Sequence, residues 1–169
     1  GLLTDLTQGS ELYVSQFILS PDADELWFIA DTCGKDEIFH IDVKTRAISQ
    51  LTHDCADYTS LALAEGSLLS VRTTMFCPPD LFKVDVATGK AENISNVNAK
   101  TLAKVNMGRA EERWLTTTDG KKMLTWVILP PDFDQQKKYP ALLYCQGGPQ
   151  STISQFWSRR WNFALMAAN

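Results

Sequence analysis

The clearest pattern along the chain is an alternation of apolar and polar residues that occurs twice. Residues 37–52 read EIFHIDVKTRAISQLT and residues 80–95 read DLFKVDVATGKAENIS, a spacing of 43 residues. In both segments apolar residues recur at every second position, as in a half-buried strand, and a polar turn follows. Each segment closes with an apolar and a hydroxyl residue, Leu51-Thr52 and Ile94-Ser95, and Leu6-Thr7 has the same character one unit earlier. We therefore predict a structural repeat.

The residues before each repeated segment predict two further strands. Residues 14–31 read as a strand, a Ser-Pro-Asp turn and a second strand, and residues 58–74 read in the same way around a turn at Glu65-Gly66. Four short strands in a unit of this length are typical of one blade of a β-propeller. The alternative is an ordinary antiparallel β domain. The aligned apolar positions and the shared Asp42 and Asp85 favour blades, although two units do not close a propeller.

The pattern changes near residue 100. Residues 96–100 form a polar linker, and two strands are then predicted at 112–118 and 123–129. Asp119-Gly120 between them is a strong hairpin signal, and Pro130-Pro131 ends the second strand because proline cannot donate to a sheet.

A different kind of strand follows a polar loop. Ala141–Cys145 is a continuous apolar run, which predicts a strand buried on both faces of an α/β sheet. Behind it, apolar residues at helical spacing predict a helix, with Arg159 and Arg160 on its solvated face. The apolar positions of that helix are Trp157, Trp161, Ala164, Leu165 and Ala168. The chain therefore changes from all-β repeats to an α/β unit.

Composition and charge narrow the function classes. Hydrophobic residues make up 44% and charged residues 21%, as in ordinary globular proteins, and the net charge is −4. This balance gives no sign of a nucleic-acid-binding surface, and no apolar run reaches the length of a membrane span. The first residues do not resemble a signal peptide, and both ends of the sequence fall within predicted elements. We therefore expect a fragment of a longer protein; an exported or periplasmic location and a cytoplasmic one both stay open.

Four cysteines carry little information on chemistry. No C-x-x-C occurs, which excludes zinc-ribbon and thioredoxin-like sites. Cys145 lies in the predicted buried strand and is expected to be a small core residue. A disulfide between two of the remaining three, Cys33, Cys55 and Cys77, is left open. No metal or other cofactor is predicted, because the nearby acidic residues lack metal-ligand spacing: Asp31, Asp36 and Asp54.

The loop Gln146-Gly147-Gly148-Pro149 lies between the predicted buried strand and the predicted helix. In lipases and esterases an HGGG-type motif at such a place supplies a backbone N–H to the oxyanion of acyl transfer. Glycine lets the backbone approach a substrate closely. Taken alone, the loop is more simply interpreted as a tight strand-to-helix turn, as in any doubly wound sheet, than as an oxyanion loop.

The segment 111–151, EERWLTTTDGKKMLTWVILPPDFDQQKKYPALLYCQGGPQS, resembles the prolyl oligopeptidase family of serine peptidases, which includes dipeptidyl peptidases and acylaminoacyl peptidases. Members of that family join a β-propeller to a C-terminal α/β-hydrolase domain. The resemblance implies that residues 1–99 are the last propeller blades and that residues 100–169 are the truncated start of the hydrolase domain.

The same resemblance assigns roles in the loop. Gly148 would supply the oxyanion-hole N–H, and Gly147 would shape the loop. The family commonly has His or Tyr where this chain has Gln146. The amide of Gln146 could donate to the oxyanion or only support the loop, and the sequence leaves both open.

The rest of a serine-peptidase site is absent from this sequence. No G-x-S-x-G elbow occurs, and the two histidines, His40 and His53, precede the predicted hydrolase strands, whereas the order in such enzymes is Ser, acid, His. We expect the catalytic residues after Asn169 and predict that the 169-residue chain alone is inactive. The pair Glu111-Glu112 is interpreted as a solvated strand start.

The sequence is compatible with three functions of the full-length protein. The first is a serine exopeptidase of dipeptidyl- or acylaminoacyl-peptidase type that acts on short peptides through an acyl-enzyme. The second is a propeller-bearing esterase of the same fold. The third is a non-catalytic interaction module with a vestigial hydrolase domain. A homo-oligomer of the full-length protein stays open.

Overall fold

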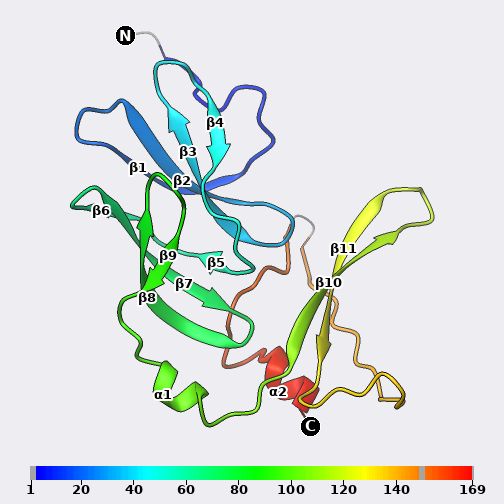
Figure 1. The fold of residues 1–169 in the computed structure, drawn as a ribbon. Coiled ribbons are helices and arrows are strands. Elements are labelled where there is room, and N and C mark those ends of the chain that lie inside the picture. The colour runs from blue at the N-terminus through cyan, green and yellow to red at the C-terminus, as the bar shows by residue number, and fades with distance from the viewer. Residues whose placement is uncertain (1–2, 149–150, 169) are drawn as a thin grey trace.

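The computed structural model describes residues 3–148 and 151–168, and its first part consists of two stacked antiparallel sheets (Figure 1). The upper sheet has the order β1-β2-β3-β4, with β1 at Val14–Leu19, β2 at Glu25–Asp31, β3 at Asp36–Asp42 and β4 at Ile48–Gln50. The lower sheet has the order β5-β7-β8-β9, with β6 also paired to β7. Its strands are β5 at Asp57–Tyr58, β6 at Ala62–Ala64, β7 at Ser67–Thr74, β8 at Cys77–Asp85 and β9 at Ala91–Asn93.

The predicted repeat is confirmed residue by residue. β3 pairs with β4 through Ile41↔Ile48, and β8 pairs with β9 through the equivalent Val84↔Ala91. The turns match as well, because Asp42 and Asp85 each accept the backbone N–H of the threonine three residues on, both at 2.8 Å. Within the described residues the sheets do not close into a ring, so the repeat is shown and a complete propeller is not.

The closing dipeptide of each repeat forms an acid–hydroxyl clamp, as we call the following arrangement. The backbone N–H of Ile38 donates to Thr52 Oγ1 at 2.9 Å, and the Thr52 hydroxyl donates to the Glu37 carboxylate. The second repeat has the same arrangement, with the Leu81 N–H donating to Ser95 Oγ at 2.9 Å and the hydroxyl donating to Asp80. In both units the hydroxyl therefore bridges the carboxylate and the backbone N–H of the residue that follows the acidic residue.

The core lies between the two sheets and behind the upper one. Side chains from β2, β3, β5, β7 and β8 fill the space between the sheets: Trp27, Ile29, Ile38, Tyr58, Leu68 and Val84. The alternate residues of β2 and β3 face the other side, where the rings of Phe28 and Phe39 stack at 5.3 Å. Leu6, Leu12 and Val14 pack against this second cluster. The central strands β2 and β3 of the upper sheet are thus buried on both faces.

The second part of the chain lies beside the sheets (Figure 1). The short helix α1 (Ala99–Leu102) leads to the hairpin of β10 (Arg109–Thr116) and β11 (Lys122–Leu129). The predicted turn is confirmed, and Gly120 takes the left-handed conformation that the turn requires, with φ 81°. The helix α2 (Phe163–Ala168) packs against β11.

The predicted buried strand at Ala141–Cys145 is wrong for this structure. The segment has no regular conformation, Leu142 and Leu143 are 78% and 83% exposed, and Cys145 is exposed rather than a core residue. A buried strand needs a partner on each edge for its backbone groups. Among the described residues, no strand pairs with this segment.

The predicted helix is only partly confirmed. It begins at Phe163, and Trp157 and Trp161 precede it. Ser158 Oγ accepts the N–H groups of Arg160 and Trp161 at 3.1 and 3.0 Å, a local turn that competes with helix formation. Asn162 Oδ1 then accepts the N–H of Leu165 at 2.8 Å, which is the hydrogen bond of an N-cap. Polar side chains therefore place the helix start later than the apolar spacing suggests. The two arginines, Arg159 and Arg160, are exposed as expected.

The cysteines and the helices bear on a possible disulfide and on membrane insertion. All four cysteines are free thiols in the structure, so the disulfide is not formed here. None of the helices in the described ranges is long and apolar enough to cross a membrane.

Candidate oxyanion loop and its anchor

The candidate loop, residues 146–148, is exposed and is held on its N-terminal side by an aromatic contact. The Tyr144 hydroxyl donates to Gln146 Oε1 at 3.0 Å. The Tyr144 ring in turn contacts the rings of Trp161 and Phe163, at centroid distances of 5.6 and 5.2 Å. The oxygen of the Gln146 amide is therefore engaged within the protein.

Gly147 has open space beside its backbone. A Cβ at this position would meet nothing within 4 Å, and its φ lies outside the left-handed region. The backbone conformation of Gly147 is open to other residues as well. What glycine provides here is free space beside the main chain, through which another group can approach it. Its carbonyl accepts the Ser151 hydroxyl at 2.6 Å, and Gly148 is exposed beside it. Pro149, the last residue of the predicted QGGP loop, lies outside the described residues.

The C-terminal side of the loop is held by residues 152–155, which we call the anchor segment. Ser154 Oγ donates to Asp57 Oδ2 at 2.6 Å, and the Gln155 N–H donates to Asp57 Oδ1 at 3.0 Å. The N–H of Asp36 donates to the same Oδ1 at 3.1 Å. Asp57 is only 1% exposed, and burial raises its pKa despite these donors. One carboxylate thus joins both sheets to the anchor segment.

Two more contacts hold the anchor segment against the hairpin and the upper sheet. The Trp126 indole N–H donates to the carbonyl of Ile153 at 2.9 Å, and Thr152 hydrogen-bonds Asp31. Gly34 packs closely against the same hairpin. A Cβ at Gly34 would come within 2.7 Å of the Leu124 side chain and 3.1 Å of the Trp126 indole nitrogen. Gly34 also has a φ of 71°, so both the lack of space and the left-handed backbone conformation disfavour a side chain at this position.

The carboxylates around the anchor segment repel one another. Burial and the charges of Asp57 and Asp31 raise the pKa of Asp36 to about 6. Burial also raises the pKa of Asp31. The nearby ammonium of Lys35 is paired with Glu112 at 3.2 Å, which links the β2–β3 turn to β10. The pair Glu111-Glu112 is therefore engaged in ion pairs, since Glu111 contacts Arg109 and Arg113 on its own strand.

Neither histidine forms part of a catalytic arrangement in the described structure. His40 is on β3, where it pairs with Glu25 and its ring lies 5.7 Å from that of Trp27. His53 is exposed in the loop after β4 and lines a small polar pocket together with Cys33 and Lys35. No group of His, Cys, Asp and Glu within residues 3–148 and 151–168 could hold a metal ion.

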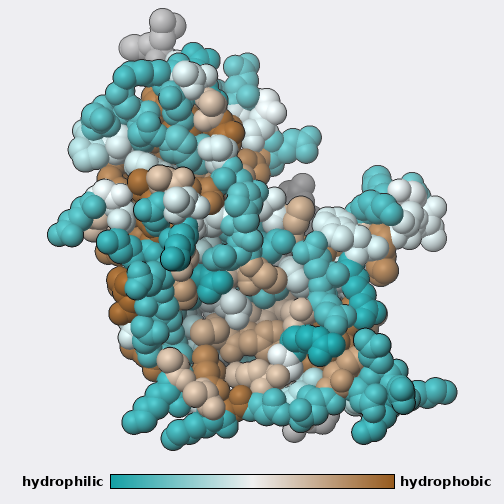
Figure 2. Space-filling model, in the orientation of Figure 1, coloured by the Kyte–Doolittle hydropathy of each residue, from teal (hydrophilic) through white to brown (hydrophobic). Residues whose placement is uncertain are grey.

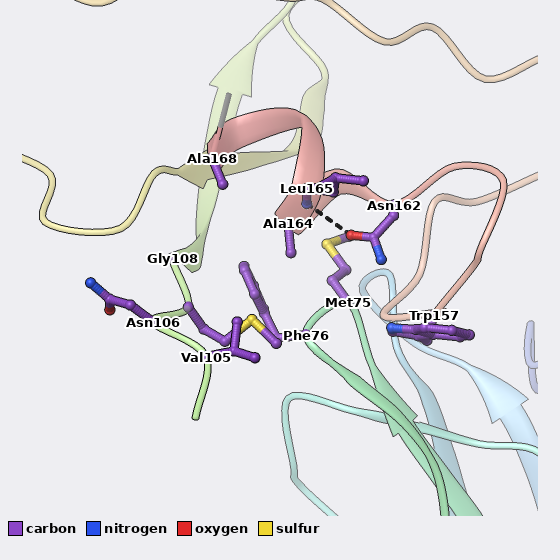
Figure 3. A pocket seen from close by; sticks show the side chains of 11 residues that line it. Met75, Phe76, Val105, Asn106, Gly108, Trp157, Asn162, Ala164, Leu165 and Ala168 are labelled. Carbon is purple, nitrogen blue, oxygen red and sulfur yellow. Dashed lines mark hydrogen bonds between the residues drawn. The ribbon is translucent and has the colours of Figure 1, made fainter. Parts of the chain in front are cut away.

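An apolar cavity of about 220 Å³ lies between the lower sheet and α2 (Figure 3). Met75 and Phe76 from the β7–β8 turn, Trp157, and Ala164 from α2 line it. Apolar side chains also gather on the molecular surface between the lower sheet and the hairpin (Figure 2). The lining contains no ionisable side chain, so this cavity can contribute packing but no acid–base chemistry.

Comparisons with known proteins give the family. No protein-family model matches the chain. It is 44% identical over 144 residues to the dipeptidyl-peptidase 5 of Porphyromonas endodontalis, over 85% of this chain and 21% of that protein. With the dipeptidyl-peptidase 5 of Porphyromonas gingivalis the identity is 44% over 148 residues, or 88% of this chain and 22% of that protein. Over the residues it spans, the chain belongs to the prolyl oligopeptidase family. It spans about a fifth of the length of these curated relatives.

The fold agrees with that membership. A solved acylaminoacyl peptidase in complex with Z-Gly-Gly-Phe-chloromethyl ketone matches with a TM-score of 0.81 over 99% of this chain and 25% of that chain, at 16% identity. At that identity the likeness shows the fold alone. The stacked sheets, the hairpin and the segment after it are therefore arranged as in a prolyl oligopeptidase-family protein.

The oxyanion loop was predicted from the sequence and stays a prediction, whereas the contact between Asp57 and the anchor segment was not predicted. Asp57 stands between Ala56 and Tyr58 in a buried stretch, and a charged residue at such a place signals a carboxylate that must find donors. Its donors at Ser154 and Gln155 are almost a hundred residues away, beyond the reach of any local pattern.

Proposed function

We propose that the chain is part of a serine exopeptidase of dipeptidyl-peptidase type. Residues 1–99 are the last blades of its propeller and residues 100–169 are the start of its α/β-hydrolase domain. The observation that carries this proposal is the 44% identity to two dipeptidyl-peptidases 5, which extends over 85% or more of the chain. It favours dipeptide release over removal of acylated residues, because both of these relatives are dipeptidyl-peptidases, whereas the acylaminoacyl peptidase is similar in fold alone.

The chemical role of this chain is to provide half of an oxyanion hole. When a serine attacks a peptide carbonyl, negative charge develops on the carbonyl oxygen, and preorganised N–H groups stabilise it. The Gly148 N–H is the donor in this proposal, and Gly147 keeps the approach open, as the empty space beside it supports. The Gln146 amide can add a second donor from its nitrogen, since Tyr144 occupies its oxygen.

The nucleophile, the acid and the base are supplied by residues outside these 169. The serine hydroxyl adds to the scissile carbonyl, the base takes its proton, and the amine leaves with that proton. Water then releases the dipeptide from the acyl-enzyme. The blades restrict the site to short peptide ends.

The test is made on the full-length protein. Treatment with a fluorophosphonate probe followed by intact-mass measurement should show one probe added, and a dipeptidyl arylamide with a free amino terminus should be hydrolysed. Faster turnover of the N-acetylated aminoacyl arylamide would contradict the dipeptidyl assignment. Turnover of simple esters without arylamides would indicate the esterase, and neither labelling nor turnover would indicate a binding module.

A further inference from the structure

We propose that Asp57, a residue of the blades, is a positioning residue that holds the oxyanion loop in its active geometry through the anchor segment. This inference rests on the proposed function, because it assigns a task to that same loop. Asp57 would touch no substrate and would act only through Ser154 and Gln155.

The hydrogen bonds of Asp57 are directed at the anchor segment rather than at solvent. Both carboxylate oxygens are used, Oδ2 by the Ser154 hydroxyl and Oδ1 by the N–H groups of Gln155 and Asp36. Asp57 and Gln155 are 1% and 2% exposed. Water therefore cannot replace the carboxylate without opening the contact, and a buried donor that loses its acceptor is costly.

Among the described residues, Asp57 forms no ion pair. The charge of Asp31 opposes its ionisation, Asp57 and Asp36 repel each other, and the ammonium of Lys35 is paired with Glu112. N–H and O–H donors therefore offset part of the cost of burying the carboxylate. Because hydrogen-bond donors act over short, directed distances, Asp57 fixes where Ser154 and Gln155 lie.

The anchor segment is connected to the loop by covalent and hydrogen-bond contacts. Thr152 begins only four residues after Gly148, and the Ser151 hydroxyl bonds the Gly147 carbonyl at 2.6 Å. An oxyanion donor must lie about 2.7–3.1 Å from the oxygen that it stabilises. Displacement of reacting groups by about 1 Å can cost about 100-fold in rate. A shift of the anchor segment would therefore displace the Gly148 N–H from the position at which it can stabilise the oxyanion.

The first experiment uses the full-length protein with the substitutions Asp57→Ala and Asp57→Asn. Asp80→Ala is the matched control, because Asp80 is also buried, at 4% exposed, and accepts hydrogen bonds from Ser95, Val97 and Asn98, which all lie outside the anchor segment. With a dipeptidyl arylamide, we expect Asp57→Ala to lower kcat by about 10- to 100-fold with KM within about twofold. Asp57→Asn should recover most of kcat, since its amide can accept from Gln155 and donate to Ser154. Asp80→Ala should leave kcat unchanged.

A second readout reports on the oxyanion hole itself. A peptide aldehyde forms a hemiacetal whose oxygen occupies that hole, whereas a product dipeptide does not. We expect the inhibition constant of the aldehyde to rise in Asp57→Ala in proportion to the loss of kcat/KM, and that of the dipeptide to stay constant. Equal weakening of both inhibitors would overturn the proposal, since it would indicate a general structural defect.

A third readout separates this inference from the proposed function. Hydrogen exchange at the Gln155 amide should accelerate in Asp57→Ala and in Ser154→Ala, and not in Asp80→Ala. Unchanged exchange overturns the inference whatever the enzyme does. If the wild-type protein hydrolyses nothing, the proposed function fails and the catalytic role of Asp57 fails with it, even where the exchange result shows an anchor. If Asp57→Ala does not fold, Ser154→Ala decides: retention of full kcat overturns the proposal.

Discussion

The two acid–hydroxyl clamps have the same backbone geometry and opposite electrostatics. Burial raises the pKa of Glu37 to about 7, and the single Thr52 hydroxyl offsets only part of that effect. Burial also pushes the pKa of Asp80 upward, but hydrogen bonds from Ser95, Asn98 and Val97 outweigh it, so its pKa lies below the usual value. The two units thus share a fold but differ in the pKa of the buried carboxyl group, which depends on how many hydrogen-bond donors surround it.

The extra donors of Asp80 come from the point where the chain leaves the blades. The Val97 N–H and the Asn98 side-chain amide reach the carboxylate at 3.0 and 3.1 Å. The equivalent residues of the first repeat are Asp54 and Cys55, and no described hydrogen bond joins either of them to Glu37, which accepts from Thr52. The second clamp therefore also fastens the linker, whereas the first closes only its own sheet.

The largest expected effect concerns the turns of the two repeats, where Arg46 and Gly89 are equivalent and both have positive φ. A Cβ at Gly89 would come within 1.9 Å of the Leu51 carbonyl oxygen. Gly89→Ala should therefore lower the free energy of unfolding by about 2–5 kcal/mol, from the left-handed conformation and the overlap together. Urea denaturation measures this, and a loss below about 1 kcal/mol would contradict the contact.

The second effect tests the donor-rich clamp. Asp80→Ala leaves the donors of Ser95, Val97 and Asn98 without their acceptor, so we expect a loss of about 2–4 kcal/mol at neutral pH. The loss should shrink in acid, because the lowered pKa of Asp80 contributes stability that is present at neutral pH and disappears as the pH falls through that value. A loss that does not depend on pH would contradict an ionised Asp80.

The third effect has the opposite sign. Because Glu37 has a pKa of about 7 in the fold, its contribution to stability is present below about pH 4.5 and is lost as the pH rises toward 7. Glu37→Gln should remove this dependence and raise stability at pH 8 by about 1–3 kcal/mol. Denaturation midpoints of both proteins at pH 5 and pH 8 provide the test. Equal destabilisation by the substitution at both pH values would show that Glu37 is ionised in the fold.

The smallest effect returns to the turns. Arg46 has a φ of 60° and glycine is the residue that this conformation favours. Arg46→Gly should raise the free energy of unfolding by less than about 1 kcal/mol, because the relief of strain is partly cancelled by the entropy of glycine. A thermal melt beside Gly89→Ala shows whether the two equivalent turns respond with opposite signs.

Elements whose interacting residues lie close together in the sequence were predicted correctly, and contacts between residues far apart in the sequence were not. The strands, their turns and the β10–β11 hairpin were predicted because each is joined to a neighbour through a short connection. The segment Ala141–Cys145 was wrongly predicted because apolarity gives no information on whether a partner strand is present. The late start of α2 depended on Ser158 and Asn162, whose side chains compete with the backbone.

The candidate site divides in the same way. The loop at Gln146–Gly148 was predicted from the resemblance of its residues to a family, and its catalytic role stays a prediction. The anchor at Asp57 was not predicted, because a single aspartate has no pattern and its partners lie in a remote part of the chain. Buried acidic residues next to aromatic ones are the signal that could have drawn attention to it.

The close approach of Gly89 to the Leu51 carbonyl oxygen constrains how this protein can change over evolution. Position 46 tolerates a long side chain, so it is free to vary among relatives, whereas position 89 can accept a side chain only if the neighbouring repeat shifts at Leu51. The two units therefore cannot diverge independently at this contact. In an alignment of relatives that keep the same spacing between units, glycine should persist at position 89, and its loss should coincide with insertions or deletions near position 51.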